Sequence, residues 1–265
     1  MTHGSQPLAG RRIVITRARE QAAELVQGLA ALGAVVITAP AIRIEPVADL
    51  EPLRDALARI AQYRWVVFTS QNAVLVVFDQ LPAWGHAANH FATTRIAAIG
   101  PATGQALAAR GVSVDLLPEG YVAESLVDAI AAQGDLRGVR VLVPQAEIAR
   151  DTLAQGLRTL GAQVDVIPVY RTLPALEDGA ALASEILAGR IDAITFTSSS
   201  TVHSFVKSVG SEAATSDRYR AAVIGPVTGA TAHEYGLPVA IEATEHTTAG
   251  LLQAVATYFG SQAAS

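Results

Sequence analysis

The sequence predicts an α/β protein with two similar lobes, each built on a parallel β-sheet. Three observations lead to this fold class. Short apolar segments bounded by Gly, Pro, Ser or Thr alternate with segments of helix length, which is typical of β-α-β units. Several segments recur in the same order about 128 residues apart. Each half also contains one extended, proline-marked stretch, so we expect the chain to cross twice between the lobes.

The internal repeat consists of matching segments in the two halves of the chain. AVVITAP, which ends at Pro40, resembles the stretch that ends at Pro168, and Tyr170 stands where the first copy has Ile42. The other matches are LAALGA at 29–34 with LRTLGA at 157–162, FTS at 68–70 with FTS at 196–198, and IGPATG at 99–104 with IGPVTG at 224–229. Matches that keep one order indicate a duplication rather than chance similarity of Ala-rich segments.

The predicted elements follow from these boundaries. In the first half we expect strands at 12–17, 34–38, 64–68, 95–99 and 112–116, and helices at 19–32, 49–62, from Ser70, from Pro101 and at 122–133. Gly33 is a predicted C-cap, and a loop is expected around 82–94. The second half restarts at 138 and follows the same sequence of elements, with a strand at 164–167 that runs into an extended connector.

The two proline-marked stretches, 39–46 and 167–174, predict the domain organisation. We expect a discontinuous lobe of residues 1–39 plus 173–265 and an inserted lobe of residues 47–167, joined by both stretches. Each lobe falls within the usual domain size of about 50–250 residues. The cleft between the lobes is the expected ligand site, and the lobes would hinge about the connectors to admit a ligand.

Composition excludes several classes of function. The chain has no cysteine, which excludes disulfides, iron–sulfur clusters, thiolate zinc sites and cysteine nucleophiles. The six histidines lack metal-ligand spacing, so no metal site is expected. A net charge of −5 and 5% aromatic residues argue against a nucleic-acid partner. No segment has the apolar run of a membrane span or a signal peptide, so we expect a cytoplasmic protein.

Small hydroxylated, amide or glycine residues follow four of the predicted strands. They form the turns TSQN at 69–72, GPAT at 100–103, TSSST at 197–201 and GPVT at 225–228. Ligands of parallel sheets bind beyond the carboxyl ends of strands, where helix N-termini present free N–H groups. Ordinary N-capping by Ser and Thr explains one such turn, whereas two in each lobe favour anion binding. The candidate binding residues are Ser70, Asn72, Gly100, Thr103, Ser198, Ser199, Ser200, Gly225 and Thr228.

Two further side chains are candidates for the site. Arg17 ends the first strand, and arginine binds carboxylates through two parallel hydrogen bonds. Tyr170 lies in the second connector; it either packs between the lobes or acts chemically. A phenol with a pKa of about 10 stays protonated at neutral pH, so it suits a proton donor better than a base. No phosphate-loop, dinucleotide-binding or serine-hydrolase motif is present.

The combination of motifs resembles the uroporphyrinogen-III synthase family. The segments that carry the resemblance are VITR at 14–17, FTSQNAV at 68–74, IGPATGQAL at 99–107, AESL at 123–126, VYRT at 169–172, FTSSS at 196–200 and IGPVTG at 224–229. Each motif is weak by itself, whereas their order and spacing are specific. The resemblance extends over nearly the whole chain, from Gly10 to Phe259.

The resemblance implies a cofactor-free lyase of tetrapyrrole and heme biosynthesis. It implies lobes with flavodoxin-like strand order joined by a two-stranded connector. Its substrate is hydroxymethylbilane, a linear tetrapyrrole with eight carboxylates. The reaction expels water, inverts the last pyrrole ring through a spiro intermediate and closes the macrocycle to uroporphyrinogen III. We expect a monomer, and transient handover of the substrate from hydroxymethylbilane synthase stays open.

The resemblance also assigns roles to single residues. Tyr170 matches the family tyrosine that is the usual candidate for the acid, and Thr103, Ser198 and Thr228 match positions that line the family's cleft. One departure follows the strand at 139–144: where the family often has a basic residue and Gly, this chain has Gln145 and Ala146. Gln145 is therefore a candidate contact, and Arg150 is an alternative source of the missing charge.

Two other functions stay open at this point. A non-catalytic tetrapyrrole-binding, polycarboxylate-binding or sensor protein could use the same lobes, although the presence of Tyr170 and the lack of an attached DNA-binding segment favour the enzyme. A periplasmic-type solute-binding protein would share the two-lobed design, but we would then expect a signal peptide.

Overall fold

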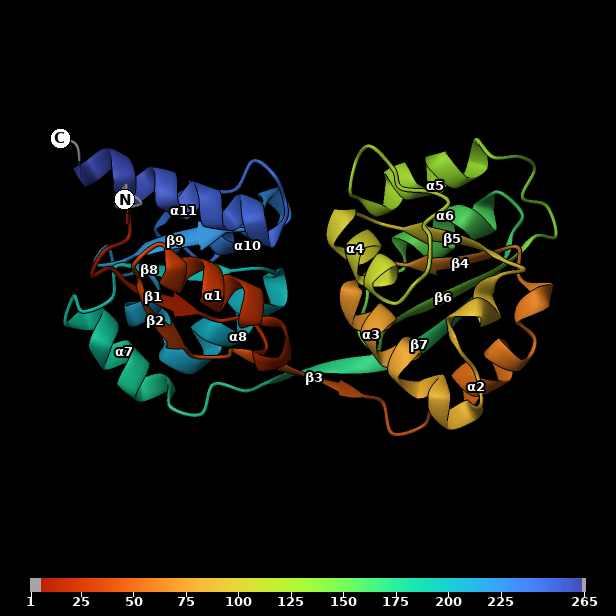
Figure 1. Cartoon of the computed structure of the whole chain (residues 1–265), viewed down its shortest axis with the longest axis horizontal. Helices are drawn as coiled ribbons and strands as arrows, with labels where there is room; N and C mark the ends of the chain where they lie inside the picture. Colours follow the sequence, from red (N-terminus) through yellow and green to blue (C-terminus); the bar gives the residue numbers. More distant parts are fainter. Residues whose placement is uncertain (1–5, 264–265) are drawn as a thin grey trace, which may run out of the picture. The chain divides into compact units, whose positions relative to one another are not determined.

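The computed structural model describes residues 6–263, and the chain divides into two compact units (Figure 1). Unit 1 consists of the residues up to Arg43 together with those from Thr172 on, and unit 2 consists of Ile44–Arg171. Both divisions fall inside the stretches that the sequence analysis takes as connectors, 39–46 and 167–174.

Unit 1 contains a five-stranded sheet in the order β10-β9-β8-β1-β2. Its strands are β1 (Arg12–Ile15), β2 (Val35–Thr38), β8 (Ala193–Phe196), β9 (Arg220–Val223) and β10 (Val239–Glu242), and all of its described pairings are parallel. Its helices are α1 (Ala23–Ala31), α7 (Gly179–Leu187), α8 (Ser199–Val209), α9 (Ser211–Ala214), α10 (Pro226–Glu234) and α11 (Thr248–Ala263), with a 3-10 turn at Arg19–Gln21.

Unit 2 contains a second five-stranded sheet, in the order β3-β7-β6-β4-β5. Its strands are β3 (Ile42–Pro46), β4 (Trp65–Phe68), β5 (Arg95–Ala98), β6 (Arg140–Ala146) and β7 (Gln163–Pro174). Its helices are α2 (Glu51–Ala58), α3 (Gln71–Gln80), α4 (Pro101–Ala109), α5 (Ala123–Ala131) and α6 (Thr152–Thr159), with 3-10 turns at Ile60–Gln62, Pro82–Trp84 and Ala88–Phe91.

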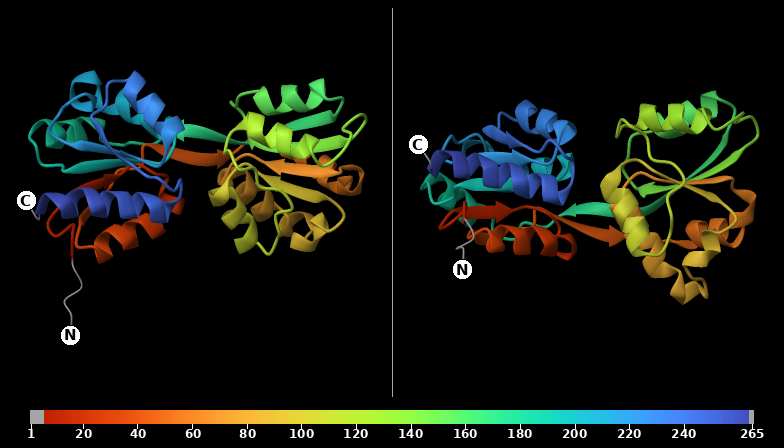
Figure 2. Two further views of the ribbon diagram at one scale, coloured as in Figure 1. Left: turned by 90° about the horizontal axis from the view of Figure 1, so that it is seen from above. Right: turned by 45° about the horizontal axis from the view of Figure 1, so that its top comes forward.

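Helices cover both faces of each sheet (Figure 2). Strand side chains alternate between the faces, so in unit 1 Val14 packs with α7, α8 and α10, whereas Ile13 and Ile15 pack with α1 and α11. In unit 2, Val66 packs with α2, α3 and α4, whereas Trp65 packs with α5 and α6. Apart from Arg12 at the start of β1, these strands are therefore apolar, as parallel strands buried on both faces are.

The duplication is visible in the strand order. Numbered along unit 1, the strands lie in the order 2-1-3-4-5, which is the flavodoxin-like order. In unit 2, β6 and β7 correspond to β1 and β2 of unit 1, and β4 and β5 correspond to β8 and β9. These four strands lie in the same relative order as their counterparts, and β3 is added beside β7. The first half of the chain thus contributes a β-α-β segment to unit 1 and then continues in unit 2. The second half contributes a β-α-β segment to unit 2 and then continues in unit 1.

The predicted strand at 112–116 is wrong. Only Leu116 forms a bridge, parallel to Ala97, in the place that β10 occupies in unit 1. The Asp115 carboxylate accepts the backbone N–H of Ile96 at 2.7 Å, a donor that a longer ladder could also have used. A side chain that competes for a backbone donor replaces ladder bonds, and this stops the strand from extending.

Two predicted helices are shorter than expected. The segment 19–32 divides into the turn at Arg19–Gln21 and α1, and the segment 49–62 divides into α2 and the turn at Ile60–Gln62. Gly33 adopts a φ of 96°, in the left-handed region that favours glycine, and ends the first of these segments as predicted.

The strand predicted at 164–167 continues through the connector as the twelve-residue β7. β3 lies beside it in the sheet, and the bonds from Val47 N–H to Val169 O and from Ala175 N–H to Ala41 O show that the two strands run antiparallel. The pairing of β7 with β6 shifts register between Gln145 and Ala146, so Pro168 and Tyr170 are partners of consecutive residues. Ile167, Val169 and Tyr170 consequently all join one core cluster, since a bulge re-aims the side chains that follow it.

A charged network lies at the amino ends of the strands in unit 2. Asp165 accepts a hydrogen bond from the Tyr63 hydroxyl at 2.5 Å and from the Arg140 guanidinium at 2.7 Å. Burial acts to raise the pKa of Asp165, but the bonds from Tyr63 and Arg140 outweigh it and leave that pKa below its ordinary value. Burial and the bond to Asp165 raise the pKa of Tyr63 to about 12.

We predict that Asp165→Asn lowers the free energy of unfolding at pH 7 by about 1 kcal/mol, a value reduced to allow for the 41% exposure of the Asp165 side chain. Because the folded-state pKa is lowered, the carboxylate stabilises the protein above its unfolded pKa of about 3.9, and this contribution is lost as the pH falls through the folded value. Urea unfolding from pH 7 to pH 3.5 measures the change. Asp55→Asn, on the exposed side of α2, is the control; an equal effect of both variants at every pH would contradict the prediction.

Candidate functional site

The candidate residues gather at the carboxyl edge of the sheet in each unit. Parallel strands end at one edge, so the turns that follow β4 and β5 lie at one edge of unit 2, and those that follow β1, β8 and β9 lie at one edge of unit 1. Unit 2 thus positions Ser70, Asn72, Gly100, Thr103, Gln145 and Tyr170, and unit 1 positions Arg17, Ser198, Ser199, Ser200, Gly225 and Thr228.

Tyr170 contacts the start of α3 through its hydroxyl. The distance from Tyr170 Oη to Ser70 Oγ is 3.0 Å, and Asn72 also bonds the phenol. Ser70 Oγ also accepts the N–H of Ala73 at 3.1 Å, and either hydroxyl can donate in the contact between Ser70 and Tyr170. When Ser70 is the donor, Tyr170 keeps its own proton for a second partner.

The environment of Tyr170 keeps the phenol protonated. Its side chain is 7% exposed and packs in the core of unit 2. Burial raises the pKa of Tyr170, and the bonds from Ser70 and Asn72 only partly offset this effect. The group is therefore a neutral acid at pH 7, which matches the role of proton donor that the sequence suggested.

The four helix starts differ in their free donors. Ser70 caps α3, and Ser198 caps α8 by accepting the N–H of Thr201 at 3.3 Å, so capping accounts for part of these two turns. Helices α4 and α10 begin at Gly100 and Gly225 without a side-chain cap, each with proline in the first turn. Their remaining first-turn N–H groups have no partner within the helix, so these two turns suit an anionic ligand best.

The serines of unit 1 join two helix starts. Ser198 Oγ lies 2.9 Å from Ser200 Oγ, and Ser199 Oγ lies 2.7 Å from Thr231 Oγ1 of α10. All three serines are half-buried, whereas Thr103 and Thr228 are buried in the first turns of α4 and α10. Ser198 and Ser200 are therefore partly accessible to a ligand, whereas the side chains of Thr103 and Thr228 are not.

Arg17 is a buried cation at the end of β1. It is 7% exposed and donates to Thr248 Oγ1 at 3.2 Å and to Gln21 Oε1 at 3.4 Å, both of which are neutral acceptors. Burial lowers the pKa of Arg17, and Glu24 acts in the opposite direction. A guanidinium keeps its charge in proteins, so a ligand carboxylate at this edge would gain a strong hydrogen bond.

The positions that depart from the family motif lie at the end of β6. Gln145 pairs with Pro168 and is half-buried, and Glu147, Ile148 and Arg150 are exposed in the turn that follows. Among the described residues, no hydrogen bond connects Gln145 or Arg150 to Tyr170. Gln145 therefore lies at the same carboxyl edge as Tyr170, but on β6 rather than on β7.

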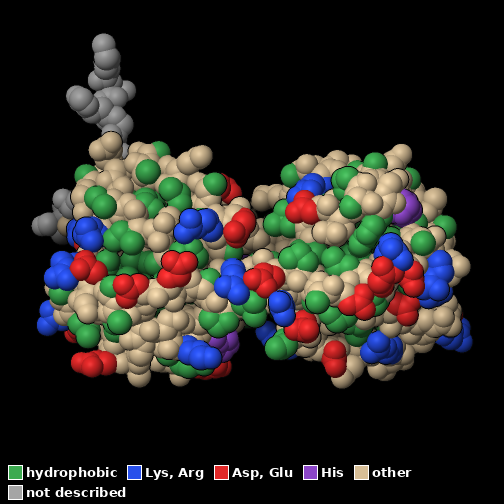
Figure 3. Space-filling model, turned by 90° about the horizontal axis from the view of Figure 1, so that it is seen from below, with side chains coloured by type: hydrophobic (Ala, Val, Ile, Leu, Met, Phe, Trp, Pro, Cys, Tyr) green, Lys and Arg blue, Asp and Glu red, His purple; other side chains and the backbone are tan. Residues whose placement is uncertain are grey.

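Charge is not concentrated on the face drawn in Figure 3, where acidic and basic side chains are interspersed on both units. Local donors such as the helix starts, rather than a broad positive field, must then attract an anionic ligand. Among the described residues, no three His, Asp or Glu side chains gather as metal ligands do, and no helix has the length and apolar character of a membrane span.

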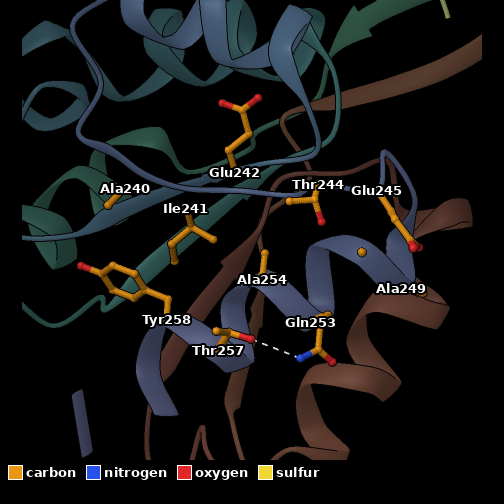
Figure 4. Close-up of a pocket in the computed structure, with 11 residues that line it drawn as sticks. Ala240, Ile241, Glu242, Thr244, Glu245, Ala249, Gln253, Ala254, Thr257 and Tyr258 are labelled. Atoms are coloured by element: carbon orange, nitrogen blue, oxygen red, sulfur yellow. Dashed lines mark hydrogen bonds between the residues drawn. The ribbon is translucent and has the colours of Figure 1, made fainter. Parts of the chain in front are cut away.

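A cleft outside the candidate site lies between β10 and α11 (Figure 4). It has a volume of about 630 Å³ and is lined by Ile241, Glu242, Gln253, Tyr258 and neighbouring residues. None of the residues singled out in the sequence lines it, so it adds nothing to their assignment.

Sequence reasoning missed the loop that precedes α11. Thr248 holds Arg17 in place, and His246 packs against Gly225 at the start of α10. The signal was the segment AGLL at 249–252, which corresponds to AESL at 123–126 in the other half. Matching these two segments would have marked the loops before α5 and α11 as equivalent parts of the carboxyl edges.

Comparison with known proteins gives one family. A family model described as "Uroporphyrinogen-III synthase HemD" matches residues 23–253. The chain belongs to the uroporphyrinogen-III synthase family. It is 35% identical to the uroporphyrinogen-III synthase of Synechococcus elongatus, over 94% of this chain and 96% of that protein, and 28% identical to that of Chlorobaculum parvum, over 87% and 92%.

Solved structures of the uroporphyrinogen-III synthase family share the fold. The Thermus thermophilus enzyme matches with a TM-score of 0.66 at 20% identity, over 96% of this chain and all of that chain. The Helicobacter pylori enzyme matches with a TM-score of 0.60 at 18% identity, over 94% and 99%. The expected fold class, two lobes with parallel α/β sheets, is confirmed.

We predict that Ser70→Ala and Ser198→Ala each lower the free energy of unfolding by about 1 kcal/mol, because each removes an N-cap. Only Ser70→Ala should also raise the pKa of Tyr170, since it removes a hydrogen bond that lowers this pKa. Urea unfolding and titration of tyrosine-labelled protein by NMR measure the two effects. Equal tyrosine titration in both variants would show that Ser70 does not control the phenol.

Proposed function

We propose that Tyr170 is the general acid of this chain. We also propose that the N-termini of α4 and α10, which have no side-chain cap, bind the substrate carboxylates. Membership of the family makes the chain a uroporphyrinogen-III synthase, a hydro-lyase of tetrapyrrole biosynthesis. The family implies hydroxymethylbilane as its substrate. The proposal assigns the steps of that reaction to residues of the two carboxyl edges.

The difficult step is the loss of hydroxide from the hydroxymethyl group. A proton from Tyr170 Oη to the leaving oxygen turns hydroxide into water, and such general acid catalysis accelerates a reaction about 10²–10⁴-fold. The Ser70 and Asn72 bonds to the phenol stabilise the phenolate that forms when the proton leaves. When the macrocycle closes, the ring carbon that forms the new bond loses a proton, and water carries this proton to the phenolate, which restores Tyr170 before the next turnover.

The remaining steps depend on positioning. After water leaves, pyrrole carbons form the new bond, and the enzyme must bring the two ends of a flexible chain together. Carboxylates held by N–H groups of the α4 and α10 starts and by Arg17 would fix that conformation. Ser198 and Ser200 are further proposed donors, and Gln145 is proposed as a weaker one in place of the family's basic residue.

The observation that carries the proposal is the Tyr170 hydroxyl at the start of α3. Buried phenols generally have polar partners, as Tyr63 does, so the supporting feature is the place of the Tyr170 hydroxyl. It bonds Ser70 and Asn72 at the carboxyl edge of the sheet, where the proposed substrate-binding turns of unit 2 lie. The alternative function, a non-catalytic tetrapyrrole-binding or sensor protein, uses the same helix starts but has no need of the phenol. Cytoplasmic location, the monomeric state and handover from hydroxymethylbilane synthase stay predictions.

The activity is tested with freshly made hydroxymethylbilane. We expect the purified chain to form uroporphyrinogen III faster than the spontaneous reaction forms isomer I, and chromatography of the oxidised products separates the isomers. Isomer I alone, at the spontaneous rate, would leave only the binding function.

We predict that Tyr170→Phe slows turnover at least tenfold, because the variant keeps the ring and loses the proton. Affinity for the product should change little. Tyr63→Phe, which removes a second buried, hydrogen-bonded phenol of unit 2 at the opposite edge of the sheet, is the matched control and should keep its turnover. Unchanged turnover of Tyr170→Phe would assign Tyr170 to packing alone.

A further inference from the structure

The loop between β10 and α11 places a histidine ring on the start of α10. A Cβ built on Gly225 would lie 2.7 Å from His246 Cδ2 and 3.1 Å from His246 Nε2, so the ring occupies the space where a side chain would be. The φ of Gly225 is 166°, an extended conformation that any residue adopts. A side chain at 225 would therefore have to displace the His246 ring, whereas the backbone angle itself would accept any residue.

The loop is fixed on both sides of His246. Thr247 Oγ1 accepts the N–H of Gly250 at 3.0 Å, and Thr248 Oγ1 accepts from Arg17 at 3.2 Å. Ala243 N–H also bonds Val223 O, which ties the loop to the end of β9. The loop that carries His246 therefore contacts Arg17 through Thr248, and through His246 it contacts the start of α10, whose first turn is exposed at Pro226 and Val227.

Unit 2 has an equivalent arrangement with different chemistry. Tyr121, in the loop before α5, packs on Gly100 at the start of α4, with its nearest side-chain atoms 3.5 Å from a Cβ built there. A ring over the glycine is thus common to both copies and explains the packing. The imidazole is what unit 1 adds, because it places a nitrogen donor beside the open turn.

We propose that His246 is a substrate-binding residue that donates a hydrogen bond to the same substrate carboxylate as the first turn of α10. The inference rests on the proposed function, since it takes a polycarboxylate as the ligand of this edge. Arg17, the N–H groups of Val227 and Thr228, and His246 then supply three kinds of donor from three segments of unit 1. Loss of one charge-assisted hydrogen bond weakens binding on the order of tenfold.

The test compares variants of His246 in the full chain. His246→Phe keeps a ring over Gly225 and removes the donor, so we expect KM for hydroxymethylbilane to rise about fivefold or more, with kcat within twofold. His246→Gln restores a donor and should recover part of the loss. His233→Phe, at an exposed position near the other end of α10, is the matched control and should leave KM unchanged.

A second variant tests the contact from the glycine side. Gly225→Ala keeps the backbone N–H groups but places a methyl group where His246 lies, so it should raise KM as His246→Phe does. The two changes should not add in the double variant, because both remove one interaction. Additive effects, or an unchanged KM in His246→Phe, would reduce His246 to a packing residue.

Binding of uroporphyrin III separates this inference from the proposed function. Fluorescence titration measures its dissociation constant without turnover, and we expect His246→Phe to weaken it on the order of tenfold relative to the unsubstituted chain. A chain that binds uroporphyrin III in a His246-dependent way but makes no isomer III would defeat the proposed catalysis and keep this inference. A chain that makes isomer III, with affinity and KM insensitive to His246, would defeat the inference alone.

Discussion

Parallel strand pairing is the constraint on which the site depends. Because the strands of each sheet run in one direction, every turn that follows a strand lies at the same edge, and every helix that begins there presents its N–H groups to that edge. Capping then divides these helix starts into two kinds. Serines satisfy a donor at α3 and α8, whereas Gly100 and Gly225 leave the first turns of α4 and α10 open. Duplication gives each unit its own set of neutral donors, so a chain of −5 net charge has local donors for an anion at the carboxyl edge of each sheet.

The proposed general acid lies where the two copies of the repeat differ. The same pattern holds Ile42 in one copy and Tyr170 in the other, and the register shift beside Pro168 directs Tyr170 into the core with its hydroxyl at the start of α3. A proline in a strand interior removes a ladder donor, and the bulge beside it accommodates this loss. The distortion in β7 is thus part of what brings a residue of the connector to Ser70, which lies 100 positions away in the sequence.

Much of this architecture could be predicted from the sequence, because it follows from repetition and apolar pattern. FTS and IGP turns at matched spacing located the strand ends, and the two proline-marked stretches located the places where the units divide. The failures have specific physical causes. At 112–116 the alternation of apolar residues is typical of a strand, but the Asp115 carboxylate accepts a backbone N–H of β5. Residue propensities describe local preferences and therefore do not predict such a bond between distant segments. The partners of Tyr170 were equally out of reach, because they depend on how β4 and β7 are placed in one sheet.

The loop before α11 shows the limit of motif reasoning most clearly. The only sequence signal for this loop is the AGLL segment that follows it, and single histidines without metal-ligand spacing are usually structural. Two contacts of this loop draw attention to His246. Its ring fills the space where a Cβ at residue 225 would lie, and Thr248, two residues further along the chain, accepts a hydrogen bond from Arg17. A glycine whose φ any residue could adopt signals a close neighbour rather than a special turn. Glycine at position 225 thus draws attention to His246, a residue that the sequence alone does not single out.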